Sequence, residues 1–422
     1  MSKASIIIIG GGVVGVSVAY HLTKRGVKEV LILEAESEQG KGSTGKATGG
    51  VRAQFETDIN ILMSKYSIDY FRNWEFDCGY DPKGYLFFAT AEDQLENLKR
   101  NVKRQRELDV RDVELIDAAT IGKRVPGMRC EDIAGGTFGA GDGFIDPIAV
   151  MNGFTEGAVR CGAKIKFSTR VTSINVSGGK VESVTTLHGE IECDKVVLCT
   201  GANARELAAT AGIDLPVEPQ WRRIVWARSA SPLPDDLPMV IDVGTGFHFR
   251  PARSFVNPRG SVERTTPTAQ SGGLPSVVRR GAFKNPPADA GGSDLRDVLL
   301  AYPDANGEHA QSAGFDEQFI GKIYEQVNRR TPFLSDSTVI TEKCRSGLYE
   351  NTPDHHAILG GCEIEGLYFA NGFSGHGVMH SPATGRALSE IILDGHSSFL
   401  DVSCLSIKRF ESGDLLHESG FV

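Results

Sequence analysis

Cysteine is scarce in this chain: there are eight in 422 residues, and no two of them form a C-x-x-C pair. Small secreted domains held by disulfides need a much higher density of cysteine, while zinc ribbons and redox dithiols need closely spaced pairs. The sequence therefore argues against these three classes of protein. A reducing compartment suits such a chain, and we predict a cytoplasmic location.

Positive charge is also in the minority. The 45 lysines and arginines face 54 aspartates and glutamates, which gives a formal net charge of -9. Proteins that bind nucleic acid present a basic surface to the phosphates. We therefore predict no nucleic-acid partner.

Long apolar runs are missing as well. The longest, Ile6 to Tyr20, is too short and too rich in glycine to cross a bilayer, which takes about 20 apolar residues. A strand-like segment starts within a few residues of Met1, so we expect no signal peptide before it. The sequence has no repeat of solenoid or propeller length. We expect a soluble globular protein, too long for one core and built from two interleaved domains.

The first 40 residues show the pattern of a βαβ unit. The apolar run "ASIIIIGGG" is typical of a strand buried on both faces, "VVGVSVAYHLTKRG" has helical spacing, and "EVLILEAE" is a second buried strand. Gly10, Gly12 and Gly15 form G-x-G-x-x-G between the first strand and the helix, and Glu34 ends the second strand. This arrangement admits a pyrophosphate at the helix start and an acid at the adenosine ribose. We therefore prefer dinucleotide binding to a helix start that is glycine-rich only for packing.

The fingerprint alone does not separate FAD from NAD. No second fingerprint follows, so electrons are expected to come from a substrate rather than from a pyridine nucleotide. A second glycine-rich stretch, "GFSGHGVMHSPATG" from Gly372, opens the last predicted helix. Amides at a helix start would stabilise the negative charge that builds on a reduced flavin at N1 and the C2 carbonyl. The two stretches together predict FAD, with one helix start for its pyrophosphate and one for its ring.

Between the two glycine-rich stretches the sequence predicts a second domain. "YLFFAT", "PVEPQWRRIVWARS" and "MVIDVGTGFHFRP" have the composition of strands, and "EDQLENLKRNVKRQREL" that of a charged helix. The predicted fold is α/β, with a Rossmann-like FAD-binding domain and an α+β substrate domain built on a mixed sheet. The predicted FAD-binding domain comprises residues 1–80, 145–215 and 346–397. The predicted substrate domain comprises residues 81–144 and 216–345 and contains a disordered insert at 252–296. Residues 398–422 are predicted to form a C-terminal tail.

Four motifs also occur in a characteristic order: "GGGVVG…LILEAE", "GSTGKATGGVR", "GLYENTPDHHAILG" and "NGFSGHGVMHSPATG". In these motifs the chain resembles the D-amino-acid oxidase-type FAD-dependent oxidoreductases. It is most similar to the branch of sarcosine oxidase β-subunits and dye-linked proline dehydrogenase β-subunits, over nearly the whole chain outside 252–296. The resemblance implies oxidation of a sarcosine-, dimethylglycine- or proline-like amino acid by hydride transfer to FAD. It also implies an unidentified electron acceptor and a possible hetero-oligomer with other oxidoreductase subunits.

The resemblance assigns roles to individual residues. Arg52 corresponds to the arginine that holds the substrate carboxylate, and Tyr349 and Met379 line the same pocket. No catalytic side chain is implied, because hydride passes from the carbon next to nitrogen to the flavin. The predicted cofactor-binding residues are Gly10, Gly12, Val14, Gly15, Glu34, Ala35, Ser43, Thr44, Lys46, Thr48, Gly49, Val171, Thr200, Gly201, Gly347, Leu348, Gly375, His376, Gly377 and Val378.

Three residues depart from the family pattern. Gly347 replaces a cysteine that binds flavin covalently in some relatives, so noncovalent FAD is implied here. Met379 replaces the lysine of monomeric sarcosine oxidases, so carboxylate binding would rest on Arg52, and sarcosine becomes a weaker candidate substrate. Arg345 stands where relatives often have tryptophan.

Two alternatives remain open at this point. His376 and His380 are four residues apart, but neither an H-E-x-x-H pattern nor a nearby carboxylate supports a metal site, and we predict none. His355 and His356 are expected in a solvated turn after Pro353.

The alternative to an enzyme is a flavin-binding assembly or scaffold protein that keeps the fold without turnover.

Overall fold

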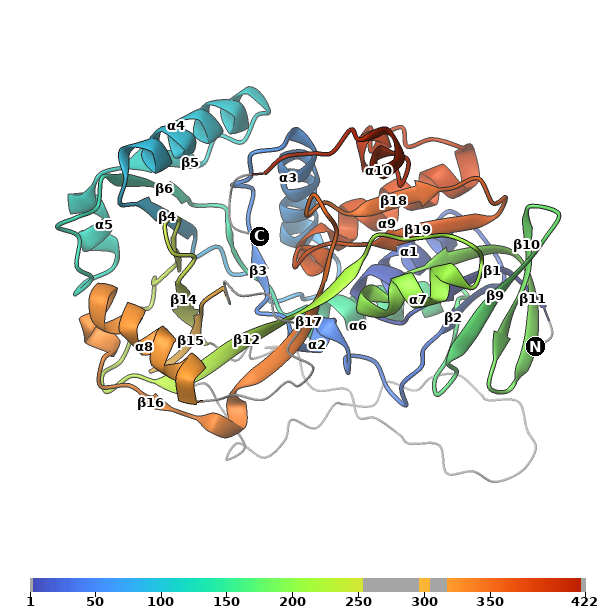
Figure 1. Cartoon of the computed structure of the whole chain (residues 1–422), viewed down its shortest axis with the longest axis horizontal. Helices are drawn as coiled ribbons and strands as arrows, with labels where there is room; N and C mark the ends of the chain where they lie inside the picture. Colours follow the sequence, from blue (N-terminus) through green and yellow to red (C-terminus); the bar gives the residue numbers. More distant parts are fainter. Residues whose placement is uncertain (1–2, 253–295, 304–316, 419–422) are drawn as a thin grey trace.

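The computed structural model describes residues 3–252, 296–303 and 317–418. Apart from its two end residues, the predicted insert 252–296 lies outside the described residues. The chain folds around two large sheets, one on the right and one on the left of Figure 1, with helices α1 (Val13–Lys24), α3 (Asp58–Asn73) and α9 (Gly377–Asp394) beside the first.

The first sheet has the parallel centre that the apolar runs predict. Strand β1 pairs in parallel with β2 on one side and with β11 on the other, and β11 pairs in parallel with β19. All four residues of β2 and most of β1 are buried, because helices or connections cover both faces. The strands in order are β18 (Ile358–Gly361), β19 (Leu367–Asn371), β11 (Gly189–Leu198), β1 (Lys3–Ile9), β2 (Val30–Leu33) and β8 (Lys164–Lys166). Off this path, β10 (Lys180–Thr186) pairs with β11, and β9 (Val171–Ser177) pairs with β10.

Helix α1 packs between α9 and α6 (Pro147–Arg160) in the first core. The contact with α9 is close, because a Cβ on Gly385 would lie 2.3 Å from the Ser17 hydroxyl oxygen. Helix α6 begins at Pro147, and the Asp146 carboxylate accepts hydrogen bonds from the amides of Ile148 and Ala149. An aspartate followed by a proline is typical of a helix start, and the structure has a helix start there.

The second sheet is mixed, as predicted: β13 and β4 are parallel, and its other pairs are antiparallel. Helices α5 (Ala118–Arg124) and α8 (Glu317–Arg330) cover one face, and α4 (Glu92–Glu107) runs beside β4, β5 and β6. The strands in order are β16 (Thr338–Val339), β12 (Glu218–Arg228), β15 (Asp297–Ala301), β14 (His248–Pro251), β13 (Met239–Asp242), β4 (Tyr85–Ala89), β6 (Gly135–Gly139) and β5 (Val113–Ile116), with β17 (Arg345–Asn351) also paired to β12.

The other face of the second sheet turns toward the glycine-rich loop of residues 42–52. Tyr85, Phe87, Met239 and Ile241 form a buried cluster there with Phe144 of β7 (Gly143–Phe144). The loop contains the short helix α2 (Ser43–Lys46) and strand β3 (Gly50–Val51), which pairs with β7. This face, the loop and the start of α9 surround the region where the predicted site residues meet.

The fold class is confirmed, and three details differ from the sequence prediction. Ala252, the first residue of the predicted insert, is buried, and its amide donates to Asp297, because β14 and β15 pair with each other. The stretch "STVITEKCRSGLYE", which the sequence predicts as extended, contains a 3₁₀ turn at Thr341–Lys343 before β17. Strand β17 lies in the second sheet, whereas residues 346–397 were assigned to the FAD-binding domain; the division into domains stays a prediction. Within the described ranges, no helix has the length and apolarity that a bilayer crossing requires.

Candidate active site

The first glycine turn has open space in front of helix α1. Gly10 has a φ of +107°, and a Cβ on it would lie 2.2 Å from the Cys199 carbonyl oxygen, so this position needs glycine. A Cβ on Gly12 would meet only the Thr44 hydroxyl, at 3.3 Å. Gly12 caps α1 without a side-chain hydrogen bond, and no acid occupies the first turn. The helix start therefore offers amides to an anion, and FAD's pyrophosphate fits there.

Glu34 lies against this turn. Its carboxylate accepts hydrogen bonds from the amides of Gly11 at 2.8 Å and of Glu36 at 2.9 Å. The amide of Thr169 donates to the Glu34 carbonyl oxygen at 2.8 Å, which brings the segment leading into Val171 beside Glu34 and Ala35. The predicted ribose and adenine residues are thus neighbours.

Thr200 and Gly201 follow β11 at the carboxyl edge of the first sheet. The wholly buried Asn371 amide, oriented to suit its neighbours, donates to Leu198 O at 2.6 Å and accepts from the amides of Thr200 and Gly201. The Thr200 hydroxyl is buried without a hydrogen-bond partner among the described residues. Glu350 accepts from the Gly372 amide at 3.0 Å, and burial raises the pKa of its carboxyl to about 7. The sequence reasoning did not identify Asn371 or Glu350.

The loop of residues 43–50 is held against the second sheet. The Ser43 hydroxyl donates to Leu348 O at 2.7 Å, and a Cβ on Gly347 would lie 3.2 Å from the Lys46 Cβ. Two arginines that the sequence did not single out for this task hold the next residues. Arg345 donates to Ala47 O at 3.1 Å, and the wholly buried Arg250 donates to Thr48 O. Gly49 accepts from the Ile145 amide at 2.8 Å.

The two glycine-lined helix starts meet in space. A Cβ on Gly377, the first residue of α9, would lie 3.6 Å from a methyl carbon of Val14 in α1. His376 caps α9 without a side-chain hydrogen bond, and its first turn holds no acid. Gly375 has a φ of +96°, and a Cβ there would lie 2.4 Å from the Tyr349 ring. The second helix start thus also suits an anionic group, with Val378 and Met379 buried in its first turn.

Arg52 follows β3 and is buried. Its guanidinium carbon lies 3.7 Å from the centre of the Phe55 ring, and its Nη2 lies 3.4 Å from Nε2 of His376. Nη1 donates to the Gln54 carbonyl oxygen. Burial lowers the pKa of Arg52, but a guanidinium keeps its charge at neutral pH. Arg52 therefore places a positive charge beside the start of α9.

Asp142 fixes the backbone next to Arg52. Its carboxylate accepts hydrogen bonds from the Ala53 amide at 2.7 Å and from the Gln54 side-chain amide at 2.8 Å. Asp142 is wholly buried, and burial raises its pKa to about 7. No motif marked this residue in the sequence.

The buried histidines of α9 are neutral. Burial, with Arg52 nearby, lowers the pKa of His376 well below its ordinary value and that of His380 to about 3. The described part of the chain contains no group of three or more His, Cys, Asp or Glu side chains arranged to hold a metal ion. The expected solvated turn is wrong for His356, which is 1% exposed, because its ring contacts the Thr57 hydroxyl at 3.0 Å. His355 is exposed, as expected.

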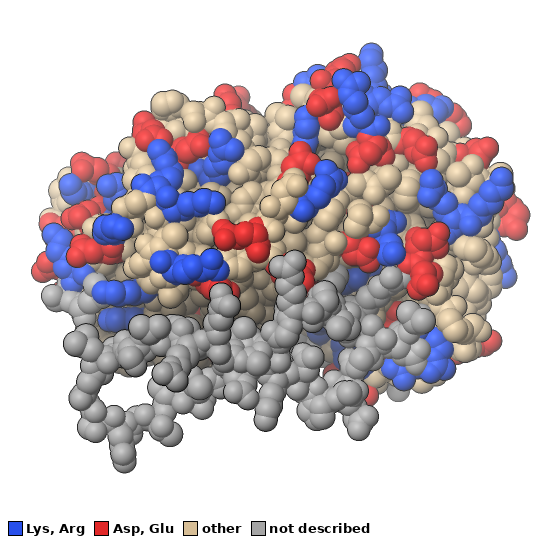
Figure 2. Space-filling view, turned by 180° about the vertical axis from the view of Figure 1, so that it is seen from behind, with Lys and Arg blue, Asp and Glu red and all other residues tan. Residues whose placement is uncertain are grey.

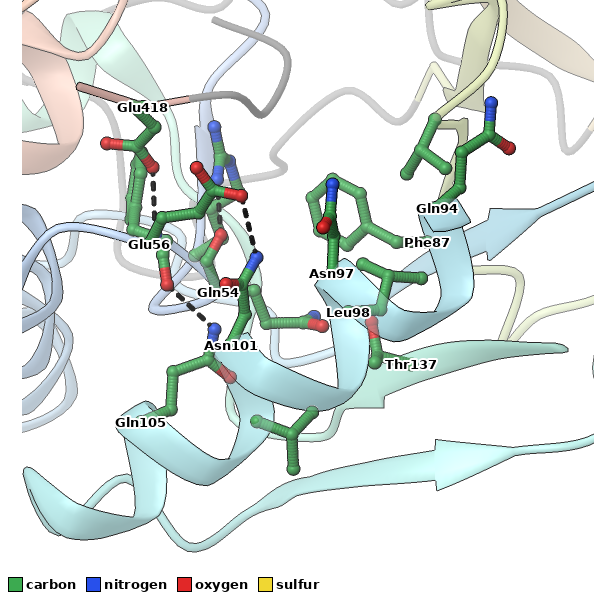
Figure 3. A pocket seen from close by; sticks show the side chains of 14 residues that line it. Gln54, Glu56, Phe87, Gln94, Asn97, Leu98, Asn101, Gln105, Thr137 and Glu418 are labelled. Atoms are coloured by element: carbon green, nitrogen blue, oxygen red, sulfur yellow. Dashed lines mark hydrogen bonds between the residues drawn. The ribbon is translucent and has the colours of Figure 1, made fainter. Parts of the chain in front are cut away.

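A cavity of about 120 Å³ is lined by Arg52 and by residues of α4, among them Asn97 and Asn101, which Figure 3 labels. Tyr349 and Met379 do not line it. The Glu418 side chain reaches it from the C-terminal segment and accepts hydrogen bonds from the Glu56 amide and the side chains of Thr57 and Asn60. The lining residues are Arg52, Gln54, Phe55, Glu56, Phe87, Gln94, Asn97, Leu98, Asn101, Val102, Gln105, Thr137, Val243 and Glu418.

Sequence reasoning missed this cavity, although α4 carried a signal for it. Asn97, Asn101 and Gln105 recur every four residues in a helix otherwise rich in charge, so they share one face. The approach of Glu418 had no sequence signal, because it joins residues about 360 positions apart.

Comparisons with known proteins agree with this geometry. The protein-family model described as FAD dependent oxidoreductase matches residues 5–391. "FAD-dependent oxidoreductase domain-containing protein 1" of Xenopus laevis is 28% identical, over 100% of this chain and 85% of that protein. The mitochondrial dimethylglycine dehydrogenase of Homo sapiens is also 28% identical, over 94% of this chain but only 43% of its own length.

Solved structures share the fold. L-proline dehydrogenase from P. horikoshii superimposes with a TM-score of 0.81 at 25% identity, over 98% of this chain and 100% of that chain. Glycine oxidase from Bacillus cereus gives a TM-score of 0.71 at 22% identity, over 93% of this chain and 96% of that one. The glycine oxidase likeness speaks for the fold alone.

Proposed function

The chain belongs to the FAD dependent oxidoreductase family and is an FAD-dependent enzyme; from that premise we propose that it oxidises a secondary or tertiary amino acid at a C–N bond. One observation carries the proposal: a buried guanidinium, Arg52, lies 3.4 Å from the histidine that caps α9. A carboxylate held by Arg52 would lie beside the second helix start. The relatives named dimethylglycine dehydrogenase, 4-methylaminobutanoate oxidase and L-proline dehydrogenase support a substrate of this class.

FAD would extend between the two helix starts. The amides before α1 would receive its pyrophosphate and Glu34 its adenosine ribose, while the 43–50 loop, Gly347 and the start of α9 would hold the ring. Gly347 offers no thiol, so we propose that FAD is bound noncovalently. The side chains of Arg250 and Arg345 would keep the loop in place through their bonds to Thr48 and Ala47.

When bound, FAD supplies the acceptor for a hydride from the carbon next to nitrogen. Arg52 would grip the substrate carboxylate through parallel hydrogen bonds, which fixes the orientation of the reacting carbon. Phe55 and Phe87 would exclude water beside it, because both rings are buried against the guanidinium. Such apolar surroundings favour the neutral form of the reacting amine. His376 and His380 stay neutral and add no second cation there.

Anaerobic titration tests this function. The purified holoprotein should lose its visible flavin absorption when sarcosine, dimethylglycine, proline or hydroxyproline, or another secondary or tertiary amino acid, is added. Primary amino acids serve as the matched comparison. If no amino acid reduces the flavin while dithionite does, the protein is not an amino-acid oxidoreductase.

The partners and the compartment stay proposals. An unidentified electron acceptor and a hetero-oligomer with other oxidoreductase subunits would suit the predicted branch of the family. The surface in Figure 2 has basic and acidic side chains interspersed on the face shown.

The cytoplasmic prediction rests on composition, whereas relatives such as the dimethylglycine dehydrogenases are named as mitochondrial. Cell fractionation would decide between these compartments.

A further inference from the structure

We propose that the cavity beside Arg52 selects amino acids that carry a hydrogen-bond donor, preferably a second amine, away from their carboxylate. The inference rests on the proposed function, since it assumes that Arg52 holds the substrate carboxylate. It concerns the remainder of the substrate, which would extend from Arg52 toward α4 and the C-terminal segment.

The charges of the cavity lining are divided between its parts. Arg52 is the only lysine or arginine among the lining residues, all of which the structure describes. The lining also has two acidic side chains, those of Glu56 and Glu418. The lining therefore suits a ligand with a carboxylate at Arg52 and a positive charge elsewhere.

Among the described residues, no donor bonds to the side-chain oxygen of Gln105. Its side-chain nitrogen donates to Phe55 O at 2.9 Å, and this bond sets the orientation of the amide group. Oε1 is then the amide atom that is left to accept a hydrogen bond. Gln105 is 2% exposed, and Oε1 has no hydrogen-bond partner in the described part of the chain. The Thr137 hydroxyl, on β6, is equally buried and likewise has no partner there. A buried polar group that stays unpaired destabilises the folded state, so a ligand that carries donors would gain by pairing with these oxygens.

Glu418 places a negative charge on the same cavity. Its side chain is 5% exposed and lies 3.5 Å from Nε2 of His356. The bonds from Thr57 and Asn60 both go to Oε2, whereas Oε1 accepts one, from the Glu56 amide. A carboxylate oxygen can accept two bonds, so Oε1 keeps room for a donor.

A plainer role for Glu418 is to neutralise Arg52, because both line one cavity. That role explains one carboxylate near one guanidinium. It does not explain the unpaired oxygens of Gln105 and Thr137, which belong to two residues of the same lining, and a ligand that carries donors would pair with them. The cavity of about 120 Å³ far exceeds the ~10–15 Å³ that a single water requires.

A matched pair of substrates tests the inference. Racemic Nα-methyllysine and Nα-methylnorleucine have side chains of similar length, and only the lysine derivative ends in an ammonium group. The native holoprotein should reduce its flavin with the lysine derivative at a kcat/KM at least about tenfold higher, as expected for one charge-assisted hydrogen bond.

Two variants test whether Glu418 and Gln105 cause the preference for the lysine derivative. Glu418→Gln and Gln105→Met should each bring the two kcat/KM values closer together, by lowering the value for the lysine derivative alone. Glu411→Gln, an exposed change in the same C-terminal segment, should leave the ratio unchanged. FAD content and melting temperature show whether each variant is folded.

The possible outcomes separate the inference from the function. Equal or better turnover of Nα-methylnorleucine by the native protein overturns the inference, and so does discrimination that survives in both folded variants. Reduction by proline or sarcosine but by neither N-methyl compound also overturns it, while the proposed function stands. If none of these amino acids reduces the flavin, the proposed function itself fails.

Discussion

Replacing Arg52 with alanine removes the proposed carboxylate anchor. The guanidinium is 7% exposed and packed on the Phe55 ring, so a carboxylate that meets it is shielded from water. A hydrogen bond to a charged group contributes about 1.5–3 kcal/mol, which corresponds to roughly tenfold to a little over a hundredfold in affinity. Arg52→Ala should raise KM for the amino acid by that factor. Arg52→Lys should recover part of the loss, because a point charge lacks the paired donors of a guanidinium.

The assay compares steady-state KM with FAD occupancy, measured from the flavin absorption per chain. Arg330→Ala is the matched control. That arginine is equally buried, lies 4.9 Å from the Phe88 ring and pairs with Asp132 at 2.6 Å, on the opposite face of the second sheet. It should lower stability without a change in KM. Unchanged KM and kcat in a folded, FAD-loaded Arg52→Ala variant would refute the assignment of the anchor.

Three further predictions follow from the cofactor site and the buried acid. If FAD is bound noncovalently, as we propose, denaturation should release the yellow colour into an ultrafiltrate; colour that remains on the chain would contradict this. Gly12→Ala should lower FAD content, because its Cβ would occupy space where the pyrophosphate fits, and it should not unfold the protein, because that Cβ would meet only the Thr44 hydroxyl; Gly321→Ala, exposed in α8 with open space around it and away from the predicted cofactor residues, should retain FAD. Asp142 keeps a proton between its unfolded pKa of 3.8 and about 7, so its burial makes the free energy of unfolding fall as pH rises through that window. Asp142→Asn should therefore flatten the decrease in Tm between about pH 5 and 7.5, and an equal decrease in both proteins would show that Asp142 does not titrate there.

Local patterns predicted much of this fold. The strand, turn and helix around Gly10 depend on nearby residues, since the tight turn needs a positive φ and the helix needs only its own apolar face. The same holds for the helix start at Pro147, where Asp146 caps the first turn. The parallel pairing around β1 follows from apolar runs that require cover on both faces.

Contacts between distant segments were not predictable in the same way. The burial of His356 depends on Thr57 and Glu418, which approach it from opposite ends of the chain. Asp142 carries no local signature, because its partners Ala53 and Gln54 lie about 90 positions earlier. The resemblance supplied Arg52 and Tyr349, but it gave no information on the cavity beside Arg52, whose lining depends on how α4 and the C-terminal segment pack in this particular chain.

The most direct test of the account is the colour of the flavin under anaerobic conditions. The holoprotein is titrated with Nα-methyl amino acids and, for comparison, with the corresponding primary amino acids, and the visible absorption is followed. We predict stoichiometric bleaching by at least one N-methyl compound, with release of the imine product's hydrolysis fragments. A flavin that dithionite reduces but that no secondary or tertiary amino acid bleaches would contradict the central claim.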